Sequence, residues 1–492
     1  MILSGFIVIP LLYIISTFFP LSLRQKQWGV VAMALANMAM AICLVAGVHD
    51  AGMVKTTMGS WPAPYAIVLV ADRLSAFLLA IASLLVLALA LYSIQSVDQE
   101  RQSKGFFQFF AGIVMGVNGS FIAGDLFNLF VWFEVMLMSS FILMSHGGGK
   151  QQLAGSIKYL ILNLISSFFF VAGIGLLYGQ TGTLNFAHLS QIIMGYKTLP
   201  AAFNAPLTLI AIAFAIKGAL FPFFFWLPAS YHTPPPAVSA FFSGLLTKVG
   251  IYSLIRMYMM VLRFDGGAWN DIFLWIGGSS MVIGVITATS QFDFRKILSF
   301  HIISQVGYVV LAIGFSTIAA TAGAIFFLGH NMLAKTGVFL VAGWAKKRKG
   351  TLDLHRLGDL FGRSKLWSIL FLIPAFSLAG IPPLSGFIGK FAIIKSGIDS
   401  DHVIAALTAL FVGLFTLFSM LKIWIEVFWK PLPSPIEPIS SDNEGLMVTG
   451  ALLVATAVIF MGVMGAPIMD FCTRAADDLF DPNIYIQFVL KK

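Results

Sequence analysis

The chain has 492 residues, of which 59% are hydrophobic and only 10% carry a charged side chain. Soluble domains are about 25% charged, so this composition, with a mean hydropathy of +0.91, excludes a soluble fold and indicates a polytopic membrane protein. The net charge of +9 is no sign of nucleic-acid binding, because the basic residues concentrate in the loops between apolar runs.

Apolar runs of about 20 residues, the length that spans a bilayer as a helix, recur along the whole chain. The first run has no basic segment before it and no cleavage site of small residues, so we expect a retained helix rather than a signal peptide. The sequence predicts an all-α membrane protein of about fourteen transmembrane helices. Their expected spans are 3–20, 28–48, 73–95, 105–122, 126–145, 155–179, 206–231, 238–262, 270–290, 297–316, 318–344, 367–397, 402–430 and 446–468.

Basic residues are unevenly shared between the two sets of loops. The odd-numbered loops hold most of the Lys and Arg residues, above all the cluster between 346 and 365. The positive-inside rule therefore places these loops in the cytoplasm and both termini outside. The sequence also predicts the structure of three shorter segments: a strand within 65–75, a surface amphipathic helix over 351–361, and a polar, Pro-rich connection over 431–444.

Two of the expected helices contain helix-breaking residues near their centres. Pro222 interrupts the run 215–236, and Pro382 and Pro383 interrupt the run 376–390. Proline removes a helical hydrogen-bond donor, and backbone freed in this way inside a membrane must face protein or a water-filled cavity. We therefore expect discontinuous helices with breaks near 218–222 and 380–386.

The two breaks lie about 163 residues apart, and the same offset carries the fifth expected helix onto the tenth. Corresponding helices then run in opposite directions, which is typical of the inverted repeats of transporters. We expect one membrane domain, 1–492, with three N-terminal helices (1–104), a first five-helix repeat (105–262), a second (270–430) and a last helix (446–468). The alternative is that these are two unrelated proline kinks.

Six titratable residues, here called the titratable row, lie far inside apolar runs. A charge at the centre of a membrane helix costs roughly 2.5–3.5 kcal/mol on insertion scales. A chain carries such groups either because they form static structural ion pairs or because protons are transferred along them. Several amines share the membrane with a single carboxylate, so most of them cannot be paired, and this favours proton transfer. The row consists of Glu134, Lys217, Lys248, His330, Lys335 and Lys390.

Position along the helices suggests a role for each member of the row. Glu134 and Lys217, beside the first break, would form a gate whose lysine gains and loses its proton as the carboxylate approaches and withdraws. Lys248 lies too far from a helix end to snorkel to the interface, so we expect a relay role. His330 can carry a proton either way, although a structural hydrogen bond is the alternative for it.

The sequence shows no sign of a metal or redox centre. Na⁺ needs a cage of oxygen ligands, and no such arrangement is evident. Two cysteines, Cys43 and Cys472, are too few to hold zinc or an iron–sulfur cluster. We expect no cofactor and no catalytic residue in the enzymatic sense.

Five motifs together resemble the antiporter-like subunits of respiratory complex I and, more closely, the D subunits of multisubunit Mrp-type Na⁺/H⁺ antiporters. They are Glu134, KGALFPFFFWLPASY (217–231), PPAVSAFFSGLLTKVGIY (235–252), HNMLAK (330–335) and AGIPPLSGFIGK (379–390). The resemblance implies fourteen helices with two inverted repeats, and a hydrated path in which Glu134 and Lys217 gate, Lys248, His330 and Lys335 relay, and Lys390 serves the exit. It also implies assembly in a bacterial plasma membrane with a larger homologous subunit and several small hydrophobic subunits.

Lys390 and the chain length decide between the branches of this superfamily. The complex I subunit of similar length resembles this chain but usually has a glutamate at the position of Lys390, and the large Mrp subunit is far longer. The expected function is therefore proton translocation within a Na⁺/H⁺ antiporter. The alternative is a proton-pumping subunit of a complex I-like oxidoreductase or membrane-bound hydrogenase; a carrier for organic solutes is disfavoured because no polar, substrate-sized lining is evident.

Overall fold

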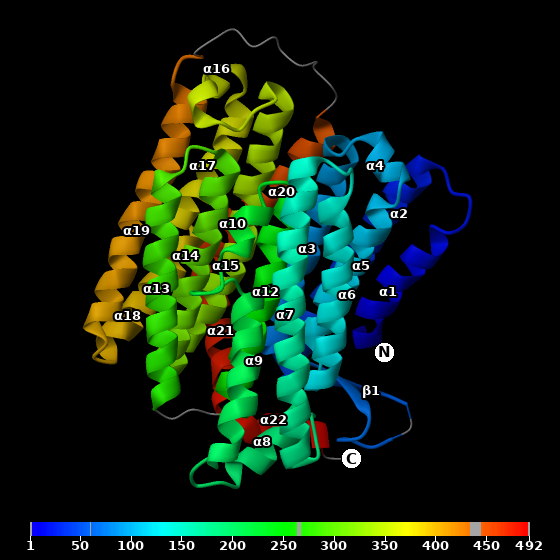
Figure 1. The fold of residues 1–492 in the computed structure, drawn as a ribbon, viewed down its shortest axis with the longest axis vertical. Helices are drawn as coiled ribbons and strands as arrows, with labels where there is room; N and C mark the ends of the chain where they lie inside the picture. Colours follow the sequence, from blue (N-terminus) through cyan, green and yellow to red (C-terminus); the bar gives the residue numbers. More distant parts are fainter. Residues whose placement is uncertain (1, 60, 263–266, 433–443, 491–492) are drawn as a thin grey trace.

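The computed structural model describes residues 2–59, 61–262, 267–432 and 444–490 of the chain, which is almost entirely helical (Figure 1). The longer α-helices are α1 (Ile2–Ser16), α2 (Leu23–Ala51), α3 (Arg73–Ser96), α5 (Phe106–Ile122), α6 (Leu126–Ser145), α7 (Lys150–Thr181), α9 (Asn204–Lys217), α13 (Ala268–Ser290), α14 (Phe294–Gly314), α15 (Ile318–Lys349), α17 (Lys365–Ala379), α18 (Ser385–Asp399), α19 (Val403–Ile423), α20 (Gly445–Val463) and α21 (Gly465–Phe480). The shorter α-helices are α4 (Gln99–Ser103), α8 (Phe186–Met194), α10 (Trp226–Ser230), α11 (Pro236–Phe241), α12 (Thr247–Ile255), α16 (Leu360–Arg363) and α22 (Pro482–Leu490).

Within the described residues, ten helical segments are long and apolar enough to cross a bilayer. Four shorter apolar helices accompany them: Ile2–Ser16, Phe106–Ile122, Ala201–Lys217 and Lys365–Ala379. A multi-pass membrane fold is thus confirmed. The total of fourteen spans stays a prediction, because these four helices are shorter than a full crossing.

Three segments form the buried centre of the helix bundle. The spans Pro236–Val261 and Ile318–Lys349 are fully buried over their most apolar windows, and Phe294–Gly314 is almost fully buried. The first of them combines α11 and α12 with two π-helical turns, η2 (Phe242–Leu246) and η3 (Arg256–Val261). Helices such as α7 and α19 instead present many exposed apolar side chains, as lipid-facing helices do.

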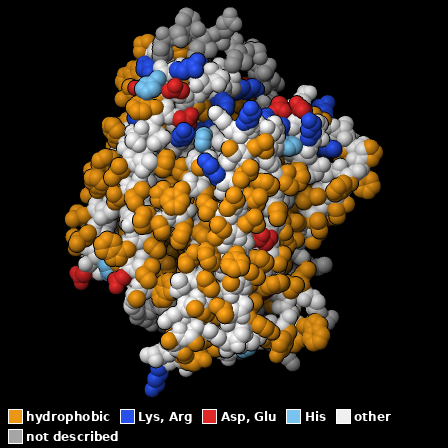
Figure 2. All heavy atoms as spheres, viewed as in Figure 1, with side chains coloured by type: hydrophobic (Ala, Val, Ile, Leu, Met, Phe, Trp, Pro, Cys, Tyr) orange, Lys and Arg blue, Asp and Glu red, His pale blue; other side chains and the backbone are white. Residues whose placement is uncertain are grey.

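One end of the bundle is basic, as the loop charges indicate. Figure 2 shows Lys and Arg side chains gathered at the upper end, above a broad apolar surface. The antiparallel hairpin of β1 (Met53–Met58) and β2 (Ile67–Asp72) lies at the opposite end with α8 and α22 (Figure 1). The strand expected within 65–75 is confirmed by β2, whereas its partner β1 was not predicted.

The prediction of an amphipathic helix over 351–361 is wrong. That segment contains only a 3₁₀ turn, Leu354–Arg356, and the start of the four-residue α16. Asp353 caps the 3₁₀ turn, and Asp359 adopts a left-handed conformation (φ 56°) while its amide donates to the Lys430 carbonyl, so the helix cannot continue. The Pro-rich connection expected over 431–444 lies mostly outside the described residues.

Candidate functional site

The first break follows Lys217 directly. Helix α9 ends there, Ala219 takes a left-handed conformation (φ 54°), and α10 begins only at Trp226. The irregular backbone is hydrogen-bonded by protein groups: the Trp226 indole donates to the Ile216 carbonyl (3.0 Å), and the Phe221 amide donates to the Ser280 hydroxyl (2.9 Å). The helix is thus interrupted around Pro222, and these freed groups face protein as membrane depth requires.

The second break separates α17 from α18. Helix α17 ends at Gly380 in a left-handed conformation (φ 90°), and α18 starts at Ser385, after Pro382 and Pro383. Lys390 reaches back across the gap, its ammonium donating to the Leu378 carbonyl at 2.7 Å. A carbonyl left free at a helix end thus solvates this buried amine.

Lys248 gains its solvation from a different irregularity. The π-helical turn Phe242–Leu246 precedes it in an otherwise helical span, and the Lys248 ammonium donates to the Ser243 carbonyl within that turn. A π-turn shifts the i, i+4 hydrogen-bond register, and such turns are frequent at functional sites. Gly244 lets this span approach α15 so closely that an added methyl group would overlap the Thr336 hydroxyl.

The environment of Glu134 differs from the one that the sequence predicts. The carboxylate is half-buried at the side of α6 rather than buried in the bundle, and it accepts a hydrogen bond from the Ser167 hydroxyl of α7. The described contacts contain no direct ion pair between Glu134 and Lys217. The Lys217 ammonium instead lies 4.9 Å from the centre of the Phe133 ring, although the charge of Glu134 is close enough to act on it.

Lys335 is the least solvated member of the row. It lies on the central helix α15, almost fully buried, and its ammonium has no hydrogen-bond partner among the described residues. Lys248 and Lys390 are both near enough for their charges to act on it. Three amines thus share one electrostatic neighbourhood at the centre of the bundle.

His330 lies five residues before Lys335 on α15 and faces the second break. Its Nδ1 is 2.9 Å from the Ser385 hydroxyl and 3.3 Å from the Ser377 hydroxyl, while its Nε2 has no partner among the described residues. The charges of Lys335 and Lys390 both act on the ring. His330 therefore occupies the junction between the central and terminal lysines.

Packed elements connect the six members of the titratable row. Helix α6 packs on α7, α7 on α9, and α9 on α12; the adjoining π-turn packs on α15, and α15 packs on α18 (Figure 1). The row consequently follows neighbouring elements from the Glu134 side of the bundle to the Lys390 side.

Several polar side chains of the interior were not among the predicted site residues. Both ring nitrogens of His301 and the side-chain oxygens of Gln305 and Asn331 are buried without a hydrogen-bond partner among the described residues. The charges of Lys335 and Lys390 also act on His301. The sequence signal was the i, i+4 spacing of His301 and Gln305 on one face of the tenth expected helix, which indicated only a supporting role.

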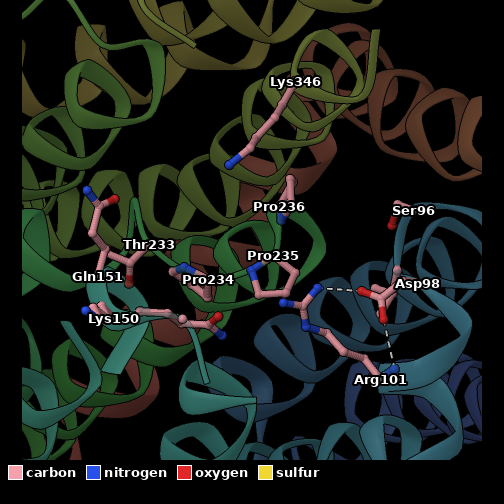
Figure 3. A pocket seen from close by; sticks show the side chains of 13 residues that line it. Ser96, Asp98, Arg101, Lys150, Gln151, Thr233, Pro234, Pro235, Pro236 and Lys346 are labelled. Atoms are coloured by element: carbon pink, nitrogen blue, oxygen red, sulfur yellow. Dashed lines mark hydrogen bonds and ion pairs between the residues drawn. The ribbon is translucent and has the colours of Figure 1, made fainter. Parts of the chain in front are cut away.

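A cavity of about 480 Å³ opens at the basic end of the molecule (Figure 3). Arg101, Lys150 and Lys346 contribute to its lining beside the Pro234–Pro236 segment that follows the first break. A second cavity of about 410 Å³ shares Thr233 with it and is also lined by His232. No member of the titratable row lines either cavity, so the row lies deeper in the bundle.

The chain is similar to proteins of a known family. Residues 123–416 match the family model described as NADH:quinone oxidoreductase/Mrp antiporter, transmembrane. The chain is 40% identical over 495 residues to the D subunit of the Na⁺/H⁺ antiporter of Alkalihalophilus pseudofirmus, covering 100% of both chains.

Two solved structures share the fold. One is a chain of the Mrp complex from Dietzia sp., with a TM-score of 0.91, 30% identity and 99% coverage of both chains. The other is a chain of respiratory complex I from Thermus thermophilus, with a TM-score of 0.84 and 22% identity, covering 98% of this chain and 100% of that one. The second likeness concerns the fold alone.

Proposed function

Since the chain belongs to the family of Na⁺/H⁺ antiporter D subunits, within the NADH:quinone oxidoreductase/Mrp antiporter family, we propose that its titratable row carries protons during Na⁺/H⁺ exchange. Similarity to antiporter subunits supports a secondary transporter subunit rather than an enzyme. In the proposed path Glu134 and Lys217 gate, Lys248, His330 and Lys335 relay, and Lys390 serves the exit.

The observation that carries this proposal is the environment of Lys335. A buried ammonium without a hydrogen-bond partner among the described residues, with Lys248 and Lys390 acting on it, is costly as a static arrangement. Charges inside membrane segments are tolerated chiefly where they serve ion or proton movement. Three neighbouring amines that exchange one proton avoid being charged at the same time.

The gate is the part of the proposal that depends on movement. Glu134 is bound by Ser167 and is not in contact with Lys217, which corresponds to an open gate. Closing it would bring the carboxylate to the ammonium and favour the protonated lysine. Alternation between these two arrangements would couple proton uptake at Lys217 to the state of Glu134.

The finer architecture is also proposed. Fourteen transmembrane helices would form two inverted five-helix repeats, 105–262 and 270–430, with α9–α10 and α17–α18 as the corresponding broken helices. Each pair leaves a lysine, Lys217 or Lys390, close to irregular backbone. Discontinuous helices in corresponding positions of two halves are a pointer to transport sites.

We further propose assembly with other antiporter subunits, among them a larger homologous subunit and small hydrophobic ones. Glu134 supports a partner on the α6 side, because a half-exposed carboxylate at membrane depth is costly against lipid. The proposed location is a bacterial plasma membrane, with the basic end of Figure 2 in the cytoplasm and both termini outside.

A complex I-like proton pump is the second candidate, and the fold likeness to respiratory complex I is the observation behind it. The 40% identity to an antiporter D subunit over the full chain favours exchange over redox-driven pumping.

The two functions differ in what accompanies the chain. The tagged chain should copurify from its native membrane with hydrophobic antiporter subunits, and vesicles containing the assembly should lose a preset ΔpH when Na⁺ is added. Copurifying flavin or iron–sulfur subunits, with a ΔpH indifferent to Na⁺, would instead establish the redox pump.

A further inference from the structure

A short chain of hydroxyl groups crosses the second break and ends on His330. The Gly386 amide, at the start of α18, lies 3.2 Å from the Ser377 hydroxyl of α17. The Ser377 hydroxyl lies 3.1 Å from the Ser385 hydroxyl, which lies 2.9 Å from His330 Nδ1. These residues belong to three elements, α15, α17 and α18, so the chain ties both sides of the break to the histidine.

The direction of these hydrogen bonds follows from counting hydrogens. A backbone N–H only donates, so Ser377 accepts from Gly386 and keeps its own hydroxyl hydrogen to give. If Ser377 donates to Ser385 and Ser385 donates to His330, the Gly386 amide hydrogen and both hydroxyl hydrogens have acceptors. In this arrangement Nδ1 is the acceptor, so the neutral ring carries its hydrogen on Nε2.

The opposite direction leaves a hydrogen without an acceptor in the cluster. If His330 Nδ1 carried the hydrogen and donated to Ser385, Ser385 would donate to Ser377. Ser377 would then accept from both Ser385 and Gly386, and its own hydrogen would have no acceptor among its described contacts. Nε2 has no partner among the described residues in either direction, so the first direction leaves one polar group unpaired and the second leaves two. Buried polar groups are rarely left unpaired, so the first direction is favoured.

We propose that Ser385 and Ser377 are positioning residues for His330, fixing its ring across the break and holding its neutral form as the Nε2–H tautomer. This rests on the proposed function, in which His330 relays protons between Lys335 and Lys390. Nε2 is then the atom that offers a proton, and Nδ1 takes one up only when Ser385 turns its hydroxyl away. Besides the two serines, two charged groups interact electrostatically with the ring: Lys335 on its own helix and Lys390 on α18. The same two lysines also interact electrostatically with His301 on α14.

Nitrogen-15 NMR of the histidine-labelled antiporter complex tests the tautomer directly. The signals of His330 are identified by their loss in His330→Gln. We expect a non-protonated, hydrogen-bonded Nδ1 and a protonated Nε2 in the neutral ring, and a changed tautomer ratio in Ser385→Ala. A protonated Nδ1 in the wild type, or an unchanged spectrum in Ser385→Ala, would overturn the proposal.

Exchange measurements test the consequence for transport. Removing a group that orients a metal-bound histidine costs about 10–100-fold in affinity or activity. We expect a loss of the same order for this metal-free histidine, so Ser385→Ala should lower Na⁺/H⁺ exchange about tenfold, and Ser385→Thr should restore most of it. The matched control is Ser368→Ala, because Ser368 is equally buried on α17 but, within the described part of the chain, its hydroxyl bonds only the Ser364 carbonyl.

Assembly is checked by copurification of the partner subunits for every variant. Wild-type exchange in Ser385→Ala beside an inactive His330→Gln would overturn the positioning role and leave the relay intact. Wild-type exchange in His330→Gln would show that His330 is not part of the relay, and it would overturn the positioning proposal as well.

Discussion

At the scale of single residues, the intramembrane lysines are accommodated in three different ways. Lys248 and Lys390 donate to carbonyls that a π-turn and a helix break make available. Lys217 lies against an aromatic ring, and Lys335 has no partner among the described residues. A hydrogen bond to an ammonium contributes about 1.5–3 kcal/mol, a stabilisation that the described contacts give to Lys248 and Lys390 but not to Lys335.

Lys390 and Lys395 allow a matched test on a single helix. Lys390→Ala should reduce Na⁺/H⁺ exchange to the background of empty vesicles, because it removes the proposed exit amine. Lys395→Ala should leave exchange unchanged, since Lys395 is exposed and pairs only with Asp399. The measurement is Na⁺-dependent ΔpH collapse in vesicles, and equal exchange in both variants would take Lys390 out of the path.

The functional residues could be predicted from the sequence only in part. The lysines are conspicuous because each interrupts an apolar run. The exposure of Glu134 was not predictable, since an apolar run does not reveal which face of the helix meets lipid. The hydroxyl chain from Ser377 to His330 was not predictable either, because it joins three elements across a break.

At the scale of elements, the broken helix α17–α18 depends on a close approach of its two halves. Gly386 lies against the end of α17, where an added methyl group would overlap the Ser377 carbonyl and lie 2.9 Å from His330 Nε2. The break is therefore packed as tightly as a core and is no flexible gap.

Gly386→Ala should destabilise the assembled complex by about 1–3 kcal/mol, the usual cost of overpacking, and should impair exchange. The control is Gly175→Ala on α7, where an added methyl group meets no atom within 4 Å. Thermal unfolding of the two purified complexes measures the difference. A Gly386→Ala complex as stable and as active as the control would contradict the tight packing of this break.

A second element-scale feature is a buried ion pair at the end of the bundle opposite the basic end. Asp72, at the start of α3, forms a doubly hydrogen-bonded ion pair with Arg256 in the π-turn Arg256–Val261, and both side chains are at most 3% exposed. Tyr252 also bonds the guanidinium, and the ring of Tyr485 in α22 lies 5.8 Å from it. The sequence did not reveal this pair, because its members are 184 residues apart.

Asp72→Asn tests that pair while keeping a side chain able to cap α3. Leaving a buried arginine without its partner costs about 3–5 kcal/mol, so the unfolding temperature of the complex should fall clearly. Asp98→Asn is the control, because Asp98 also caps a helix and pairs with an arginine but is exposed. Exposed ion pairs contribute only about 0.2–1 kcal/mol to stability. Equal losses in the two variants would show that burial of the Asp72 pair is unimportant.

At the scale of the whole molecule, composition and apolar runs predicted the multi-pass membrane fold. They did not predict α8, β1 or the C-terminal helices α21 and α22. These elements are short or amphipathic, and they are held by contacts distant in sequence, such as the Lys55 ammonium donating to the Phe488 carbonyl at 2.6 Å. A run of apolar residues reports burial in lipid or protein but not which distant segment provides it.

The charge asymmetry of the whole molecule predicts its orientation. A tag at either terminus should be digested by protease added to intact cells, whereas a tag inserted in the basic 346–365 region should be digested only after lysis. The reverse pattern would mean that the basic end of Figure 2 faces outward.

Lys335→Ala tests the central claim, proton movement along the titratable row during Na⁺/H⁺ exchange, most directly. The measurement is Na⁺-dependent collapse of a preset ΔpH in vesicles that hold the complete antiporter complex with or without this substitution. We expect a fully assembled complex whose ΔpH no longer responds to Na⁺. An assembled Lys335→Ala complex that collapses ΔpH at the wild-type rate would contradict it.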